Sequence, residues 1–584
     1  MTVLTRRRAL VLGALLPLSL VGLLLPGLGA APLERAEIYF VDAARAMVER
    51  GDYLVPYYRG EPFFDKPALT YWLMAASFRG FGVSLGAGRL VSALAALACI
   101  VATAGLGRRL LGPRPAVYGA LALGTTLLVL SFGRVAMSDM LLTLWCTLAV
   151  AIAVAMTDET GATLGRMAAL GATLGLGFLT KGPVALVLAG LGLALLVLRG
   201  HEGRRPRLDA RALAVGALAF SIVGLGWFAA VAWRLGLAPL EYFFLRENLE
   251  RFAGETYDAE RSPLFYVWTY FAAGLPWSLL FPLAAVRGAR RTGFLLLWMG
   301  LMAVPLSLSR GKIDYYLLPL LPAASLVIGS HLAAEWDRTD REWARGALIA
   351  FAVIALVPAA LQPRIPTDWL PGWPSQVALI ALGAAVALAA ALAAARPSPS
   401  RTAAVFAAGT AATLALLAAA FLPAFRRAQP NAAVVTDVRR ERSWRPDAEL
   451  AACGDPARVA RDLLFEARLT AQDRCDVWAP ASSRLPFLLL VGPEQRRSLD
   501  LVPGIREIAV YHCVPAAAMT LGQILGGLET EPIVLLANYH TDDPVAETKR
   551  VKDRKRALRR EAAAWEAAQR QAAASGSPVP PVRP

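Results

Sequence analysis

Long apolar blocks recur along most of this chain, and short polar turns separate them. A helix needs about 20 apolar residues to cross a bilayer core of roughly 30 Å. The blocks have this length, so they predict thirteen membrane helices and a mainly α, polytopic membrane protein. The predicted helices span residues 9–29, 84–107, 115–134, 138–156, 163–180, 182–198, 212–234, 264–286, 293–309, 315–334, 346–362, 376–395 and 402–424.

The first apolar block has two interpretations. Arg6, Arg7 and Arg8 precede apolar residues up to Leu28, which is the pattern of a secretory signal peptide with its basic start. The apolar stretch is longer than such a signal requires. We therefore favour a first helix that is retained in the mature protein.

Basic residues alternate between the two ends of the predicted bundle. Arginines are frequent in every second loop, as at Arg108-Arg109 and Arg290-Arg291, and rare in the short loops between them. Loops rich in Lys and Arg stay in the cytoplasm. The N-terminus is therefore predicted to be cytoplasmic, and an odd number of helices places everything after about residue 427 on the periplasmic side of a bacterial inner membrane.

The composition agrees with a membrane protein and excludes other classes. Of the 584 residues, 56% are hydrophobic and only 18% are charged, and the mean hydropathy is +0.48. A soluble domain of this length would be far more polar. The net charge of +16 arises from arginines in loops between apolar blocks, so it indicates membrane topology and not nucleic-acid binding.

The C-terminal part of the chain changes character. Short apolar runs at 486–491, 505–511 and 532–537 predict strands, and 456–469 and 516–527 predict helices. We therefore predict a small periplasmic α/β domain over 427–545. Residues 546–584 are predicted to form a basic helix around 549–560 and a disordered tail. A solvated helix and one that contacts anionic headgroups are both compatible with that charge.

Cysteines are few and divided between the two parts. Cys99 and Cys146 lie inside apolar blocks, where a thiol is most often an inert core group. The three others lie in the predicted periplasmic domain, where one disulfide can form. Cys453 with Cys475 is the favoured pair, although the spacing does not fix the pairing.

Charged and polar side chains gather next to membrane helices on the predicted outer side. Charges at membrane depth are costly, so such groups are functional candidates. A carboxylate can accept the proton of an acceptor hydroxyl, while cations stabilise the charge that grows on a departing phosphate. No nucleotide-binding loop occurs in a suitable setting, so a lipid-phosphate donor fits better. The candidates are Glu37, Arg45, Asp65 and Lys66 in the long first outer loop, 30–83, and Asp139, Lys181, Lys312 and Tyr316 in later outer turns.

Each candidate also has a structural interpretation. Asp65-Lys66 can be a local ion pair at the membrane surface, and Tyr316 an interfacial anchor. Lys181 and Lys312 can simply neutralise the C-terminal ends of helices. These alternatives stay open from the sequence.

Several short motifs occur in a fixed order between about residues 10 and 330. They are Ala36-Glu37-Ile38-Tyr39, Gly51-Asp52-Tyr53, Phe64-Asp65-Lys66-Pro67, Leu179-Thr180-Lys181-Gly182-Pro183, Glu247-Asn248-Leu249 and Lys312 through Tyr316 to Pro319. Together they resemble the outer loops of the aminoarabinose transferases that modify lipid A. More broadly, the chain is similar to the protein mannosyltransferase-like group with the GT-C fold.

The resemblance implies a fold, an activity and partners. Residues 1–426 would form a GT-C transmembrane domain. The activity would be an inverting transfer of a hexose or pentose from an undecaprenyl-phosphate carrier to an acceptor such as lipid A, another envelope glycan or a protein. The resemblance leaves Glu37 or Asp139 as the catalytic acidic residue, and it implies that the donor phosphate is bound by Lys66, Lys312 and Arg45. Lys181 and Tyr316 are further candidates for binding the donor phosphate.

Two positions depart from the family pattern. Ala36 stands where the family has an essential Asp, which leaves Glu37 or Asp139 for the chemistry. Glu260 stands where the family has a His that helps to bind a divalent metal. Asp65 and Glu260 can still hold a hard cation through oxygen ligands, but a zinc site built on His is not expected.

Two other classes of function compete with a transferase. A secondary transporter or lipid flippase is also a multi-helix protein, but its charges lie near the midplane on broken helices, often with internal repeats. The chain shows neither feature. A non-catalytic assembly partner is the third class, and Ala36 keeps it open. No motif identifies the sugar or the acceptor.

Overall fold

A computed structural model of the chain divides into two compact units. One unit contains the helices up to residue 428, and the other contains one helix and a sheet. The structure describes residues 20–31, 33, 36–200, 204–206, 208–250, 261–365, 370–428, 430–452, 471–473, 486–492, 496–497, 499, 505–513 and 531–538.

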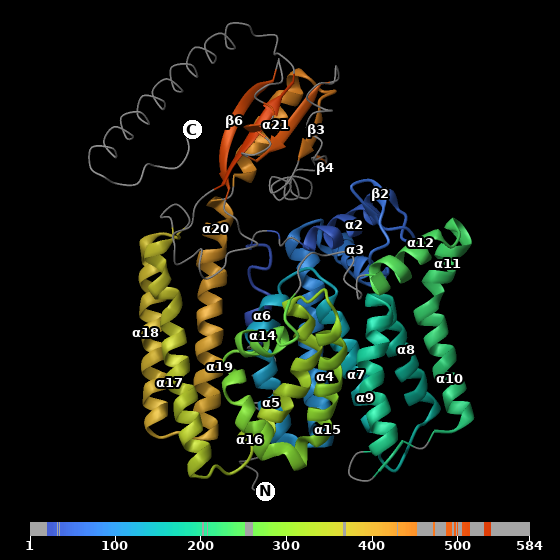
Figure 1. The fold of residues 1–584 in the computed structure, drawn as a ribbon, viewed down its shortest axis with the longest axis vertical. Helices are drawn as coiled ribbons and strands as arrows, with labels where there is room; N and C mark the ends of the chain where they lie inside the picture. The colour runs from blue at the N-terminus through green and yellow to red at the C-terminus, as the bar shows by residue number, and fades with distance from the viewer. Residues whose placement is uncertain are drawn as a thin grey trace. The chain divides into compact units, whose positions relative to one another are not determined.

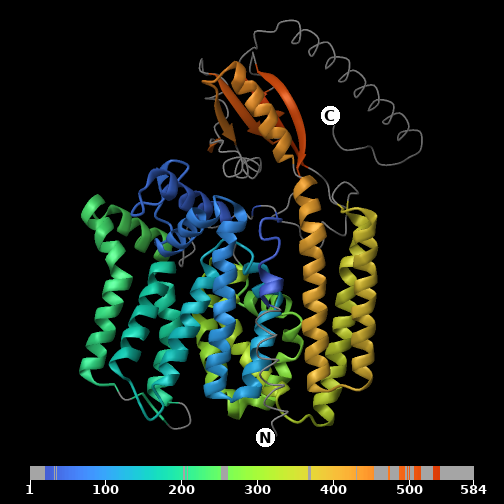
Figure 2. The same ribbon diagram turned by 180° about the vertical axis from the view of Figure 1, so that it is seen from behind.

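The first unit is a bundle of helices, shown from two sides in Figures 1 and 2. The helices are α2 (Glu37–Arg50), α3 (Leu69–Phe81), α4 (Leu85–Leu110), α5 (Pro113–Gly124), α6 (Leu127–Phe132), α7 (Asp139–Ala155), α8 (Leu164–Lys181), α9 (Pro183–Arg199), α10 (Ala210–Phe220), α11 (Gly226–Leu235), α12 (Ala238–Glu241), α14 (Phe265–Ala273), α15 (Phe281–Leu308), α16 (Leu321–Leu332), α17 (Arg338–Leu361), α18 (Trp373–Ala395), α19 (Pro399–Leu416) and α20 (Leu422–Ala428). Shorter π and 3-10 segments are η1 (Ser221–Leu225), η2 (Tyr242–Glu250), η3 (Trp277–Leu279), η4 (Asp314–Leu320), η5 (Gln362–Arg364) and η7 (Leu417–Phe421).

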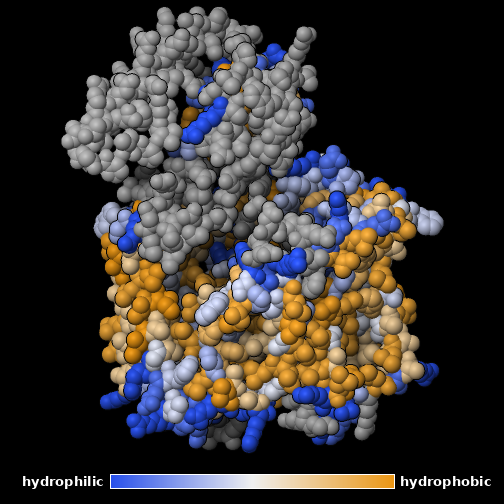
Figure 3. Space-filling view, in the orientation of Figure 1, coloured by the Kyte–Doolittle hydropathy of each residue, from blue (hydrophilic) through white to orange (hydrophobic). Residues whose placement is uncertain are grey.

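Seven helical stretches of the described chain are long and apolar enough to cross a membrane. Six are Leu85–Leu110, Ala210–Leu235, Phe281–Leu308, Asp314–Leu332, Arg338–Arg364 and Trp373–Ala395, and the seventh begins at Pro399. Large apolar side chains stay exposed on these helices, as at Leu308 and Leu392. Figure 3 shows a hydrophobic band across the visible face of the first unit, with hydrophilic residues at both of its ends. Such a surface suits lipid, so the predicted class of polytopic membrane protein is confirmed.

Several predicted helices match the structure closely, including those at 84–107, 138–156, 163–180 and 376–395. The predicted helix 115–134 is interrupted between α5 and α6. There the Thr125 and Thr126 hydroxyls donate to carbonyls four residues earlier. The freed N–H of Leu127 donates to the carbonyl of Leu275, at 3.0 Å. Two helix breaks from distant parts of the sequence thus meet and satisfy each other's backbone groups.

The predicted pair of helices at 264–286 and 293–309 is wrong. The break lies earlier, between Ala273 and Phe281, where Pro276 lacks an N–H and restricts the residue before it. The expected loop at 287–292 is instead part of the continuous helix α15. Its arginines bind neighbouring segments, since Arg291 donates to the carbonyl of Leu111 and Arg287 pairs with Asp337 at 2.9 Å. The total of thirteen membrane helices stays a prediction, because residues 9–19 lie outside the described chain.

The first outer loop folds into two helices and a hairpin. Gly51 ends α2 with a φ of +70°, a conformation that glycine adopts at low cost, and donates its N–H to the carbonyl of Met47. A short hairpin of β1 (Tyr57–Tyr58) and β2 (Glu61–Pro62) follows, and α3 completes the loop. In both views α2 and α3 lie at the same end of the bundle as α12 (Figures 1 and 2).

The end of the first apolar block is an integral part of the bundle. Leu20, Leu24 and Leu28 are buried. Arginine side chains from three distant segments donate to backbone carbonyls between Leu23 and Ala31. Arg134 donates to Leu23, Leu24 and Pro26, Arg89 donates to Leu28 and Ala31, and Arg426 donates to Gly29. These contacts favour the retained helix over the cleaved signal.

The second unit is a five-stranded sheet with one described helix, α21 (Asn431–Trp444). The strand order is β4-β3-β5-β7-β6, with β3 parallel to β4 and β5, and β7 antiparallel to β5 and β6. Val434 and Val438 of α21 pack against one face of the sheet. The strands are β3 (Glu449–Ala452), β4 (Ala471–Asp473), β5 (Phe487–Val491), β6 (Arg506–Cys513) and β7 (Glu531–Ala537).

The three strands predicted for this unit are confirmed, and α21, β3 and β4 were missed. Four of the apolar residues of α21 form one run, 432–435, and three arginines follow in its second half, so its helical periodicity is weak. The predicted helices 456–469 and 516–527, the Cys453–Cys475 pair and the basic helix around 549–560 lie outside the described residues. Cys99 and Cys146 are buried free thiols, as expected.

Candidate functional site

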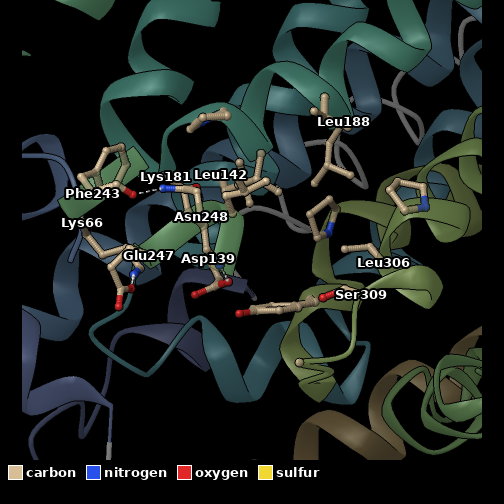
Figure 4. A pocket seen from close by; sticks show the side chains of 18 of the residues that line it. Lys66, Asp139, Leu142, Lys181, Leu188, Phe243, Glu247, Asn248, Leu306 and Ser309 are labelled. Carbon is tan, nitrogen blue, oxygen red and sulfur yellow. Dashed lines mark hydrogen bonds and ion pairs between the residues drawn. The ribbon is translucent and has the colours of Figure 1, made fainter. Parts of the chain in front are cut away.

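A cavity of about 620 Å³ lies in the first unit. Its walls come from the segment before α3, the facing ends of α7, α8 and α9, the η2 segment, and α15 with η4. Figure 4 shows Lys66, Glu247 and Asp139 on one side of the cavity, and Leu188 and Leu306 on the other. The polar lining residues are Asp65, Lys66, Asp139, Lys181, Glu247, Asn248, Ser309 and Tyr316.

Lys66 reaches this cavity from the end of the first outer loop. The preceding Phe64 is buried and packs on Trp227, with ring centroids 6.3 Å apart. The Lys66 ammonium donates to the carbonyl of Asp65 at 2.7 Å and to the carboxylate of Glu247 at 3.0 Å. It is therefore held at the cavity by a partner 181 positions away in the sequence.

Asp139 and Lys181 form an ion pair at the ends of two neighbouring helices. Asp139 opens α7, and Lys181 closes α8. A carboxylate is favourable at a helix N-terminus and an ammonium at a C-terminus. Their charged atoms lie 2.5 Å apart, and both side chains are largely buried, with 4% and 12% of their surface exposed. Lys181 therefore lies at the C-terminal end of α8 and also lines the cavity.

Two tyrosines of η4 lie near the Lys181 ammonium. The nitrogen is 4.7 Å from the ring centroid of Tyr316 and 5.8 Å from that of Tyr315. Tyr315 also packs on Phe132, at 5.0 Å between centroids. An aromatic face at this distance attracts a cation. Lys181 therefore has a carboxylate and a π face as neighbours within one cavity.

The η2 segment forms one wall of the cavity, and its contacts with the bundle include the following three. The Tyr242 hydroxyl donates to Asp65 at 3.0 Å, and burial, together with the nearby Asp65 charge, raises the pKa of Tyr242. Phe243 lies against Gly182, where an added Cβ would come within 2.6 Å of the ring. The third contact is the Glu247–Lys66 pair.

Glu37 does not line the cavity. Its carboxylate is fully buried and receives bonds from Arg89 at 2.6 and 2.7 Å and from the N–H of Ala136 at 2.6 Å. Arg89 also binds carbonyls at the end of the first apolar block. This pair joins α2, α4 and the turn before α7 to that block. The position does not fit a base that must reach an acceptor hydroxyl.

Arg45 and Lys312 are also absent from the described lining of the cavity. Arg45 pairs with Asp42 in its own helix, and burial raises the pKa of Asp42 despite that pairing. The Lys312 ammonium donates at 2.6 Å to the carbonyl of Ser309, the residue that ends α15. Its contact is that of a helix C-cap, next to the cavity, because Ser309 itself is a lining residue.

The predicted metal pair is not complete in the described chain. Asp65 lines the cavity, but Glu260 lies outside the described residues. Within the described ranges, no group of three or more His, Cys, Asp or Glu side chains is arranged to hold a metal ion. A divalent cation bound by Asp65 and Glu260 stays a prediction.

Reasoning from the sequence assigned no role to η2. Glu247-Asn248-Leu249 stood out only as one motif of the family resemblance. In the structure Glu247 pairs with Lys66, and the Asn248 amide donates to the carbonyl of Phe243 at 2.7 Å, which stabilises the segment. The available signal was a carboxylate and an amide within an aromatic stretch of a long outer loop.

Comparison with known proteins bears on this arrangement. A family model for dolichyl-phosphate-mannose-protein mannosyltransferase matches residues 65–227. The undecaprenyl phosphate-alpha-4-amino-4-deoxy-L-arabinose arabinosyl transferase 1 of Pseudomonas fluorescens is 32% identical over 354 residues, which are 58% of each chain. The corresponding transferase of Yersinia enterocolitica is 30% identical, over 50% of this chain and 54% of its own length. This chain thus spans little more than half the length of these relatives.

The fold has a close match among solved structures. The crystal structure of ArnT from Cupriavidus metallidurans bound to undecaprenyl phosphate superposes with a TM-score of 0.67. The match covers 90% of this chain and 98% of that chain, at 20% sequence identity. The apo form of the same protein gives 0.68. The expected GT-C fold and the resemblance to aminoarabinose transferase-like proteins are therefore confirmed.

Proposed function

We propose that this chain is an integral membrane glycosyltransferase that moves a sugar from a polyprenyl-phosphate carrier to an acceptor. One observation carries the proposal. Lys66, Asp139, Lys181 and Tyr316 come from four separate segments and converge on one cavity. A cavity with cations, a carboxylate and an apolar wall suits a donor that has both a phosphate and a long hydrocarbon chain.

The apolar wall offers a path for the hydrocarbon chain. Val184, Val187 and Leu188 of α9 face Leu306 of α15 in the cavity. Val187 lines the cavity and is 46% exposed, and Leu308, two residues after Leu306 on α15, is 71% exposed. The route that we propose for the hydrocarbon chain therefore runs between α9 and α15 to the lipid-facing surface. A prenyl chain on this route would leave the phosphate at the polar end of the cavity.

Asp139 and the two lysines supply the chemistry in this proposal. The Asp139 carboxylate accepts the proton of the acceptor hydroxyl, whose oxygen attacks the anomeric carbon. The bond from that carbon to the phosphate oxygen breaks, and its electron pair leaves with the phosphate. Lys66 and Lys181 stabilise the departing anion. A single displacement of this kind inverts the anomeric centre.

The names of the relatives support an undecaprenyl-phosphate sugar as donor. The acceptor class we propose is lipid A, another envelope glycan or a protein at the periplasmic face of the inner membrane. The orientation we propose has a cytoplasmic N-terminus and a periplasmic C-terminal unit. Contacts among arginine-rich turns support it, because Arg287 and Arg291 bind two other turns that are predicted to be cytoplasmic.

The test is a transfer assay on the purified full chain in nanodiscs, with a panel of undecaprenyl-phosphate sugars and envelope acceptors. The wild type should release undecaprenyl phosphate, while Lys66→Ala and Asp139→Asn should lower the rate on the order of 100-fold. Asp314→Asn is the matched control, because this exposed carboxylate does not line the cavity in the described chain. Ion-coupled uptake without any transfer would instead identify a transporter.

A further inference from the structure

A second ion pair at the cavity is made by a carboxylate that the proposed chemistry does not use. Glu247 accepts a bond from Lys66 at 3.0 Å. Only 9% of the Glu247 side chain and 18% of the Lys66 side chain are exposed. The pair is therefore largely shielded from water. Separating Lys66 from Glu247 would leave a buried charge without its partner, which is costly.

An ammonium has three N–H donors. At Lys66 one is used by the carbonyl of Asp65 and one by Glu247. A donor phosphate bound to Lys66 would thus place its oxygens beside the Glu247 carboxylate. Like charges side by side at a shielded site repel each other, which disfavours the bound phosphate. The Glu247 carboxylate therefore competes with a phosphate oxygen for the Lys66 ammonium.

The segment that carries Glu247 docks on the bundle through aromatic side chains and one pair of full charges. Phe243 is buried and packs on Phe228, with ring centroids 5.7 Å apart. The η2 segment is a π-helix, a less stable geometry than the α-helix and common at functional positions. Phe243, Glu247 and Asn248 line the cavity, whereas Leu245 is 52% exposed. Phe243 and Tyr242 dock by ring packing and one hydrogen bond. Among the described contacts of η2 with the cavity, the Glu247–Lys66 pair is the one between full charges.

We propose that Glu247 is a latch that a phosphate group must displace. With no donor bound, Glu247 holds Lys66 and keeps η2 closed on the cavity. A lipid phosphate takes over Lys66, and η2 moves away with Glu247. After transfer the carboxylate competes with the product phosphate for the same ammonium and favours its release. This inference rests on the proposed function, since it assumes that Lys66 binds the phosphate of the lipid carrier.

The test measures binding of undecaprenyl phosphate alone to the full chain in nanodiscs. Glu247→Gln keeps the shape of the side chain and removes its charge, so Kd should fall about tenfold relative to the wild type. Glu250→Gln is the matched control, because Glu250 belongs to the same segment and pairs only loosely with Arg246, at 3.9 Å. Its Kd should stay within about twofold of the wild type. Equal or weaker binding by Glu247→Gln would overturn the latch.

A second readout separates a latch from a merely structural contact. Hydrogen exchange of residues 242–250 should increase when undecaprenyl phosphate is added to the wild type, and it should already be high in Glu247→Ala without ligand. No change on adding ligand would overturn the proposal. If the wild type binds undecaprenyl phosphate and transfers sugar, but Glu247→Gln binds no more tightly, the latch alone is rejected. Failure of the wild type to bind undecaprenyl phosphate rejects the proposed function as well.

Discussion

The ammonium of Lys181 lies 2.5 Å from the carboxylate of Asp139, although 42 positions separate them in the sequence. Each charge also lies at the favourable end of its own helix. The pair therefore has two functions in the fold. It joins α7 to α8, and it places one carboxylate and one ammonium at the cavity.

Removal of one partner should destabilise the bundle. Lys181→Met leaves Asp139 without its ammonium at a site where only 4% of the carboxylate side chain is exposed. Loss of one member of a buried pair costs about 3 kcal/mol. Thermal unfolding in detergent should show a lower midpoint for Lys181→Met. The double variant Lys181→Met with Asp139→Asn should recover part of the loss. A single variant as stable as the wild type would contradict the prediction.

Gly182→Ala should disturb the η2 wall. Gly182 has a φ of +67°, and a Cβ there would lie 2.6 Å from the Phe243 ring. Both the strained backbone and the clash disfavour alanine, by about 1–3 kcal/mol. Transfer activity should fall about tenfold, and limited proteolysis should cut the η2 region faster. Gly190→Ala is the control, since a Cβ at Gly190 meets nothing within 4 Å. Equal protease sensitivity of the two variants would count against this docking role.

The turn between α7 and α8 should respond to acid. Hydrogen bonds from Arg166 hold the pKa of Asp158 below its usual value of 3.8. A lowered pKa in the folded state stabilises the fold above the unfolded value and loses this effect as the pH falls. The difference in melting temperature between wild type and Asp158→Asn should thus be present at neutral pH and narrow below about pH 4. Glu159→Gln, at the exposed neighbouring residue, should show no such narrowing. A constant difference would refute the assignment.

The first apolar block should remain in the mature protein. Arg134 binds the carbonyls of Leu23, Leu24 and Pro26 at 2.8–3.1 Å, and Leu24 is fully buried. Cleavage near residue 30 would remove all of these partners. Intact mass of the protein purified from membranes should include the residues before Leu20. A mature N-terminus near residue 31 would refute the prediction.

Properties that depend on short stretches were readable from the sequence. The length of an apolar block decides whether a helix can cross a bilayer, so the helices at α4, α7 and α18 could be predicted. Short apolar runs likewise predicted β5, β6 and β7. The prediction misplaces the break near Pro276, because the arginines at 287–291 have the composition of a loop. In the fold they bind neighbouring turns, which lets the helix continue through them.

The sequence by itself determined that this is a multi-helix membrane protein with acidic and basic groups beside its helix ends, because apolar length and charge placement are local properties. Only the tertiary structure decided which charges meet. From the sequence, Glu37 could equally have faced the cavity, but the fold buries it against Arg89. The fold also brings Glu247 to Lys66. Pairing of this kind depends on distances between helices that are far apart in the chain, and hydrophobic periodicity carries no information about them.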